Sequence, residues 1–288
     1  MDVVLALAAA LCFSLGTVLQ QQVAAKASEQ EARRAGFLLR LARRPRWLAG
    51  IAADALGFVA QAIALAVGRL VVVQPLLATS VVFSLPLGAR LGGRRVVRRD
   101  MVAALAVTAG LAVFLVVADP TGGREDATTA AWVVSFGVTA VICAALTLAA
   151  RGRRPARRAG LVGAAAGMLF GLSAALTKAT VERVDEGVLE VVADWHLYAL
   201  IVVGYVSMSL SQSSLQAGSL APAVATQMSL DPVASLLLGI FAFDETVHDD
   251  AAGLIAALAA FAVMIAGIVV LAAAEQETSE PAPRPAPT

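Results

Sequence analysis

The chain of 288 residues is 59% hydrophobic and carries a formal net charge of +1. It is too apolar for a soluble domain and too long for a single anchor, which indicates a multi-pass membrane protein. The small net charge gives no indication of a nucleic-acid partner. Cys12 and Cys143 lie inside apolar runs, which argues against a disulfide framework or a thiolate metal site. No basic stretch precedes the first apolar run, so we expect that run to be retained as a helix rather than removed as a signal peptide.

About nine apolar segments follow one another, each long enough to cross a hydrocarbon core of ~30 Å. We expect them at residues 3–25, 48–68, 70–90, 101–118, 130–150, 160–179, 196–216, 219–242 and 251–273. The predicted fold is an all-α polytopic membrane protein.

The loops between these segments differ in charge. Most of the 22 lysines and arginines fall in the loops at 26–47, 90–100 and 151–159, whereas the loops of the other side are acidic. The positive-inside rule then places the N-terminus outside and the C-terminus in the cytoplasm of a bacterial inner membrane. Residues 31–46 interleave leucines with arginines and predict a basic amphipathic helix on the inner leaflet. The tail from Glu275 is predicted to be disordered.

A helix pair that runs from Gly57 to Gly92 recurs from Gly204 to Gly239 in the same frame. The shared residues are Gly57, Val59, Pro75, Ala78, Thr79, Leu91 and Gly92 in the first copy and Gly204, Val206, Pro222, Ala225, Thr226, Leu238 and Gly239 in the second. Further matches, such as Gly110 with Gly267, extend the repeat to helices 1–4 and 6–9. Because an odd number of spans separates the copies, they are inverted, as in alternating-access carriers. We expect a first repeat at 1–118, a connector helix with its loops at 119–159, a second repeat at 160–274 and a tail at 275–288.

Asp231 is the strongest candidate for a functional residue, because a carboxylate near the middle of a membrane helix is costly. Pro232 follows it and leaves the carbonyl of Met228 without a helical donor. Our hypothesis is that Asp231 and Gln227, with the kink at Pro232, form a central site for substrate or proton. The alternative is that Asp231 merely stabilises the kink.

Other polar residues inside the predicted spans are candidates for a substrate or ion pathway. Asp54 and Gln61 lie two turns apart on one face of the second helix. Lys178 could reach the membrane surface, guard an external mouth or pair with Asp231. Gln20 and Gln21 end the first helix, and Gln212 lies in the serine-rich seventh helix; each of these glutamines could instead bond neighbouring helices.

Two further patterns have a structural interpretation. Gly163, Gly167 and Gly171 recur at four-residue spacing and predict close helix packing rather than chemistry. The histidines, His196 and His248, lie near the outer ends of predicted helices, and nothing in the sequence supports covalent catalysis or a cofactor.

The duplicated helix pair, the prolines Pro75 and Pro222 that open each second member, and the chain length resemble the drug/metabolite transporter superfamily. Within it, the run from Ser14 to Gln22 and the nine-span count resemble the NIPA-type magnesium transporter branch. Gln21 and Gln22 stand where the motif of that branch carries lysines. The acidic residue that typically closes the second helix of each pair is present as Glu245.

The residues and the resemblance lead us to expect an inner-membrane secondary transporter that moves a small solute by alternating access. A NIPA-like transporter of divalent cations such as Mg²⁺ is the alternative, and a non-transporting membrane scaffold is a second one. A cation carrier would use Asp231 and Asp54 as metal ligands, since Mg²⁺ usually keeps several waters and binds one or two carboxylates. The oligomeric state is left open, a homo-oligomer included.

Overall fold

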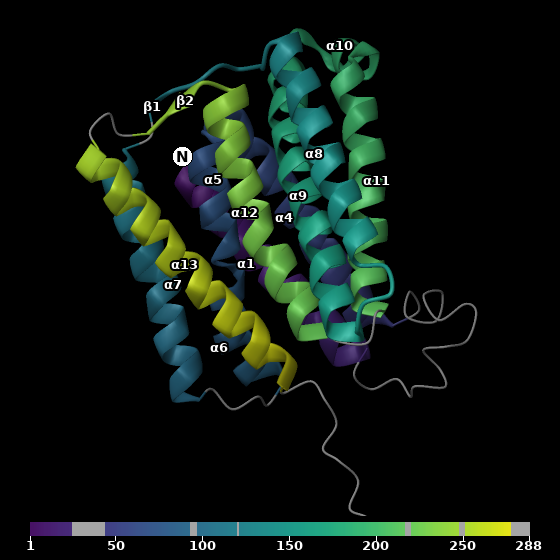
Figure 1. Ribbon diagram of the computed structural model, residues 1–288, viewed down its shortest axis with the longest axis vertical. Coiled ribbons are helices and arrows are strands. Elements are labelled where there is room, and N and C mark those ends of the chain that lie inside the picture. Colours follow the sequence, from purple (N-terminus) through teal and green to yellow (C-terminus); the bar gives the residue numbers. More distant parts are fainter. Residues whose placement is uncertain (25–43, 93–96, 120, 217–219, 248–250, 278–288) are drawn as a thin grey trace, which may run out of the picture.

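The computed structural model describes residues 1–24, 44–92, 97–119, 121–216, 220–247 and 251–277 (Figure 1). Of the amphipathic helix expected at 31–46, residues 31–43 lie outside these ranges. The last helix continues to Glu277, past the predicted start of the disordered tail, and the rest of the tail lies outside the described residues.

Helices make up nearly all of the described chain. They are α1 (Asp2–Ala24), α4 (Pro45–Val67), α5 (Leu70–Ala78), α6 (Ser80–Gly92), α7 (Arg98–Ala118), α8 (Thr129–Ala149), α9 (Pro155–Glu182), the 3₁₀ turn η1 (Arg183–Glu186), α10 (Val188–Ala193), α11 (Trp195–Gln216), α12 (Leu220–Ala242) and α13 (Ala251–Glu277). Two short strands, β1 (Thr121–Gly122) and β2 (Glu245–Thr246), pair antiparallel. Proline occupies the first turn of α4 and α9, where its missing N–H costs nothing.

Eight helical stretches of the described chain are long and apolar enough to cross a membrane. The predicted segment at 196–216 corresponds to α11, whose apolar part, Trp195–Ser211, is shorter. The polytopic all-α fold is therefore confirmed, while the count of nine spans stays a prediction. The segment expected at 70–90 is not one helix, because α5 and α6 are separated at Thr79.

Two extensive interfaces in the bundle join α9 to α12 and α7 to α13. In the first, a Cβ on Gly167 would lie 2.5 Å from the Gln227 carbonyl oxygen, and one on Gly171 would lie 2.6 Å from the Ala234 Cβ. Only glycine permits this approach, so the prediction of close packing is confirmed. In the second, Phe114 and Phe261 pack with ring centroids 5.2 Å apart.

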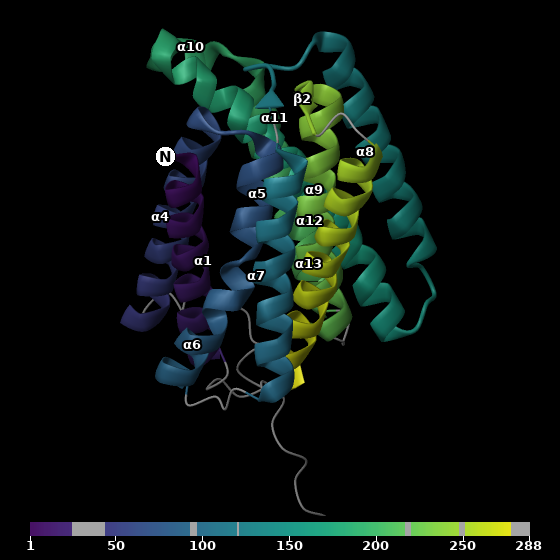
Figure 2. The same cartoon turned by 90° about the vertical axis from the view of Figure 1, so that its left-hand side faces the viewer.

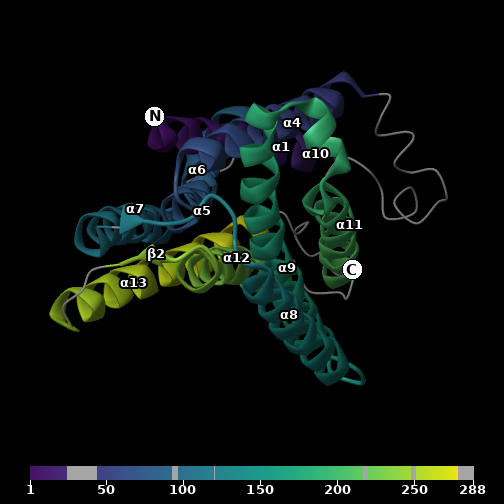
Figure 3. The same cartoon turned by 90° about the horizontal axis from the view of Figure 1, so that it is seen from above.

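The helix contacts follow a repeated pattern. α1 packs on α4 as α9 packs on α11, and α1 contacts α5 and α6 as α9 contacts α12. Figure 2 shows α1 beside α4, with α7 and α13 together on another side. This arrangement is what two repeats would produce, and the repeat itself stays a prediction. Seen from above, α8 lies at the margin of the bundle (Figure 3), and many of its valines are exposed as a lipid-facing surface requires.

The end of the bundle that carries the N-terminus, the strand pair and α10 is called the acidic end here (Figure 1). Its charged residues include Asp2, Glu125, Asp126, Glu186, Asp194, Asp244 and Glu245. The turn between α8 and α9, at the opposite end, contributes the exposed arginines Arg151, Arg153 and Arg154.

Candidate functional site

A cavity of about 330 Å³ lies in the middle of the bundle, between α1, α4, α5, α6, α9 and α12. Its polar lining consists of Thr17, Gln61, Gln74, Ser80, Ser173, Thr177, Gln227 and Asp231. Phe13, Phe58 and Phe170 supply its largest apolar surfaces. Asp231 is the one ionisable side chain among these lining residues, so a carboxylate faces a polar but otherwise neutral space.

The glycine groove of α9 determines where Asp231 lies. A Cβ on Gly171 would lie 3.0 Å from the Asp231 carbonyl oxygen, so α12 sits directly against the α9 backbone at this level. The Asp231 side chain is half-buried, and its Oδ1 accepts a long hydrogen bond of 3.4 Å from Ser235 Oγ. Because that bond is long, most of the hydrogen-bonding capacity of the carboxylate is available to a ligand in the cavity.

Gln227 lies one turn before Asp231 on α12 and also lines the cavity. Its amide oxygen accepts a hydrogen bond of 2.7 Å from Ser211 Oγ of α11, which fixes the orientation of the amide. Pro232 belongs to the cavity wall as well, and α12 continues through it to Ala242. The structure therefore brings together Asp231, Gln227, Pro232 and Gln61.

The break in a membrane-spanning helix lies between α5 and α6, and not at Pro232 of α12. Thr79 closes a tight turn, in which its N–H and its hydroxyl both donate to the Leu76 carbonyl, at 3.1 and 2.6 Å. Ala78 and Ser80, on either side of it, line the cavity. Irregular backbone at membrane depth is tolerated where it is buried in protein or lines a cavity, and both conditions hold here.

Several cavity residues were missed by the sequence analysis, among them Gln74 and Ser173. Gln74 is 3% exposed, and its Nε2 has no hydrogen-bond partner among the described residues; the same holds for Ser173 Oγ. An unpaired buried donor costs about 1–3 kcal/mol, so these groups mark a place where a ligand or water would be bound. The one available signal was the position of Gln74, directly before the first repeated proline.

Asp54 does not line the central cavity. It is half-buried on α4, with its carboxylate against Gly16 of α1. The structure thus separates Asp54 from Asp231, although Gln61, two turns along α4 from Asp54, reaches the cavity. The side chains of Gln20, Gln21 and Gln212 lie outside the part of the chain whose side chains are described.

Lys178 is buried, which corrects the expectation that it reaches the surface or pairs with Asp231. Its Nζ lies 3.2 Å from Glu245 Oε1 and donates to the Gly68 carbonyl at 3.2 Å. The two oxygens of Glu245 also accept hydrogen bonds of 2.8 Å from the Leu70 and Val71 amides. Glu245 therefore caps the N-terminus of α5, where a negative charge is favourable. Beyond Lys178, at the acidic end, a second hollow of about 300 Å³ opens.

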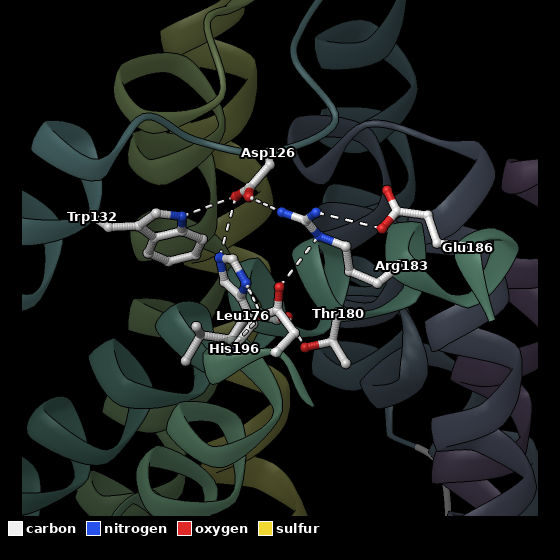
Figure 4. A network of polar contacts seen from close by, with 8 residues as sticks. Asp126, Trp132, Leu176, Thr180, Arg183, Glu186 and His196 are labelled. Atoms are coloured by element: carbon white, nitrogen blue, oxygen red, sulfur yellow. Dashed lines mark hydrogen bonds and ion pairs between the residues drawn. The ribbon is translucent and has the colours of Figure 1, made fainter. Parts of the chain in front are cut away.

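A second network of charges connects α8, η1 and α11 at the acidic end (Figure 4). Asp126 accepts a hydrogen bond of 2.9 Å from Trp132 Nε1 and lies 3.1 Å from Arg183 Nη2. His196, which is 1% exposed, has its two ring nitrogens against Asp126 and Asp194. Burial alone would raise the pKa of Asp194, but hydrogen bonds from His196 and the nearby Arg183 outweigh it, so that pKa is lowered. The sequence analysis had assigned no role to His196.

Comparison with known proteins identifies the family. The family described as "Magnesium transporter NIPA" matches residues 1–151 of this chain. An uncharacterized protein of Corynebacterium glutamicum is 30% identical over 244 residues, which cover 84% of each chain. No solved structure matches. The chain therefore belongs to the NIPA family of magnesium transporters.

Proposed function

We propose that this membrane transporter carries Mg²⁺ through the central cavity, with Asp231 as the charge that holds the ion. The observation that carries the proposal is the single carboxylate in an otherwise neutral, amide- and hydroxyl-lined space. Mg²⁺ prefers oxygen ligands and is commonly bound through one or two carboxylates, which this lining can supply. Family membership supports the same substrate class.

The cavity fits an ion that retains its water shell. Among the described residues, no group of three His, Cys, Asp or Glu side chains is placed to hold a metal ion. Mg²⁺ gives up its waters reluctantly, and an octahedral shell of six waters takes up about 180 Å³ at ~30 Å³ each. The cavity of about 330 Å³ accommodates that shell. We infer that Asp231, Gln61 and Gln227 bind the waters of the ion rather than replacing all of them.

The charges at the two ends support an orientation. An acidic end outside and arginines in the cytoplasm follow the positive-inside rule. The ion would then reach Asp231 alternately from either side as the two repeats rock, in a bacterial inner membrane. Asp54 and Gln61, on one face of α4, are proposed to line the path between Asp231 and the cytoplasm.

Flux into proteoliposomes with a trapped magnesium indicator tests this proposal. We expect uptake by the wild type and its loss in Asp231→Asn, which keeps the size of the side chain and removes the charge. Asp244→Asn is the matched control, because Asp244 is an exposed carboxylate, with 57% of its side chain accessible, at the acidic end. Equal uptake by Asp231→Asn and the wild type would remove Asp231 from the mechanism.

A small organic solute is the second candidate, because Phe13, Phe58 and Phe170 line the same cavity. Apolar walls with a few polar groups are typical of sites for organic ligands. Absence of magnesium uptake in wild-type liposomes, with a control transporter active in the same preparation, would favour this candidate. The next measurement would then be solute flux under a pH gradient.

A further inference from the structure

We propose that Lys178 and Glu245 form the gate that closes the central cavity toward the acidic end. The proposal rests on the proposed function in one respect, namely that the cavity opens alternately to two sides. It assigns to these two residues a role in transport distinct from that of Asp231.

The position of the pair supports a gate. Thr177 lines the central cavity, and the next residue, Lys178, lines the hollow at the acidic end. The Lys178–Glu245 contact therefore lies in the partition between the two spaces. Both side chains are excluded from water in this conformation, with 7% and 0% of their surfaces exposed. We infer that this contact closes the passage between the two spaces in this conformation.

The contacts of the pair join three separate parts of the fold. Glu245 belongs to β2, Lys178 to α9, and the amides of Leu70 and Val71 to the start of α5. Lys178 Nζ also lies 5.4 Å from the centroid of the Phe243 ring, a cation–π distance. Separating the carboxylate from the ammonium would release α5 and α9 from each other at this end of the cavity.

A second set of contacts closes the acidic end beyond the pair. Gly122 pairs with Glu245 across the two strands, and Arg69 Nε donates to the Gly122 carbonyl at 2.8 Å. The Arg124 amide donates to the Phe243 carbonyl at 2.7 Å. The connection between α7 and α8 is thereby fastened to the connection between α12 and α13. Opening the gate requires these links to part as well.

Charged groups suit a gate better than apolar ones in this position. A buried ion pair is held by its mutual attraction, because each partner alone would be a desolvated charge. When the partition opens, water reaches both groups and replaces that attraction. The two states therefore differ far less in free energy than the strength of the buried contact suggests, and the gate can reopen and close repeatedly.

Thiol labelling tests the gate without reference to transport. The reporter is Thr177→Cys in a Cys12→Ala, Cys143→Ala background, and a membrane-impermeant maleimide is added from the acidic-end side. We expect Glu245→Gln or Lys178→Met to raise the labelling rate at least tenfold. Glu190→Gln, on an exposed side chain of α10 at the same end, is the control and should leave the rate unchanged. Labelling that stays at the background rate in both gate variants, in protein that elutes as a single folded species, would overturn the proposal.

A cross-link tests the same gate without removing a charge, and so covers the case in which the gate variants do not fold. Thr121 and Thr246 are direct partners across the two strands, and paired residues in antiparallel strands are close enough for a disulfide. We expect oxidised Thr121→Cys/Thr246→Cys to stop magnesium flux and a reductant to restore it, with either single cysteine unaffected. Undiminished flux through the oxidised protein would contradict the gate. If the reduced protein shows no flux while the reporter labelling still responds to Glu245→Gln, the magnesium proposal fails and the gate stands.

Discussion

The central cavity and the Lys178–Glu245 pair at the acidic end differ in how completely their buried polar groups are paired. In the cavity, Gln74 Nε2 and Ser173 Oγ have no partner among the described residues, and the carboxylate of Asp231 has one long hydrogen bond. At the acidic end, each oxygen of Glu245 accepts a backbone hydrogen bond and Lys178 balances its charge. Unpaired groups are tolerated where a ligand will pair with them, whereas paired groups fix one conformation.

Binding of a ligand and closure of the cavity are therefore expected to depend on different groups. Changes to the unpaired groups of the cavity should alter transport with little loss of stability, because those groups make few contacts in the folded protein. Changes at the acidic end should cost stability, because they leave a charge or an amide without its partner. The following predictions test that separation.

Lys178→Met should have the largest effect. It leaves the Glu245 carboxylate buried without its cation. Such a loss typically lowers the free energy of unfolding by about 3–5 kcal/mol. The measurement is denaturant unfolding in detergent micelles. Adding Glu245→Gln to Lys178→Met removes the unpaired charge and should recover part of the loss. A double variant no more stable than Lys178→Met would show that the ion pair is not the source of the loss.

Gly167→Ala should come next, at about 1–3 kcal/mol, because its new methyl group would overlap the Gln227 carbonyl and force α9 and α12 apart. Gly137→Ala on α8 is the control, since nothing lies within 4 Å of a Cβ there. It should be neutral or slightly stabilising. The readout is thermal unfolding of both variants, together with magnesium flux, which Gly167→Ala should also reduce. Equal stability of the two alanine variants would argue against the groove as the element that places Asp231.

Gln74→Met should lower transport activity without lowering stability. It removes a buried donor that has no partner, so stability should stay the same or rise by up to about 1 kcal/mol. Magnesium flux should fall about tenfold, because a water of the ion loses one of its hydrogen-bond partners. Gln227→Met, which also removes an amide but breaks the bond from Ser211, should lose both stability and flux. A destabilised Gln74→Met variant would mean that this amide has a structural role.

The smallest effect is expected for the ion pair between Arg124 and Asp244, whose atoms lie 2.6 Å apart but whose side chains are 53% and 57% exposed. Arg124→Ala should change the free energy of unfolding by about 0–1 kcal/mol, and less at high salt. Comparing unfolding at low and high salt checks the electrostatic origin. A loss as large as that of Lys178→Met would contradict the distinction between exposed and buried pairs.

The sequence was sufficient for the parts of the fold that depend on local composition. Apolar length predicted the helices, and four-residue glycine spacing predicted close packing of α9, although not that its partner is α12. The cost of a mid-membrane carboxylate singled out Asp231, and Gln227 was named with it as part of one central site. Their participation in transport stays a prediction.

The remaining features depend on tertiary contacts that local patterns do not encode. The partner of Lys178 is 67 residues away, and nothing near Lys178 distinguishes Glu245 from Asp231 as the nearer carboxylate. The break at Thr79 was not predicted either, because Pro75 and Pro86 lie inside α5 and α6 and the turn forms between them. Helical spacing also suggested a common face for Asp54 and Gln61, but only Gln61 reaches the cavity.

The cap that Glu245 provides for α5 can form only late in the synthesis of the chain. The Leu70 amide and the Glu245 carboxylate are 175 residues apart in the chain, so at roughly 5–20 residues per second the ribosome makes them about 9–35 seconds apart. During that interval the first turn of α5 lacks its acceptor, and water or lipid headgroups must satisfy its amides. The acidic end is thus completed last, after most of the second half has been inserted. A nascent chain released before Glu245 would therefore keep the N-terminus of α5 open to solvent, where quality-control proteases can recognise it.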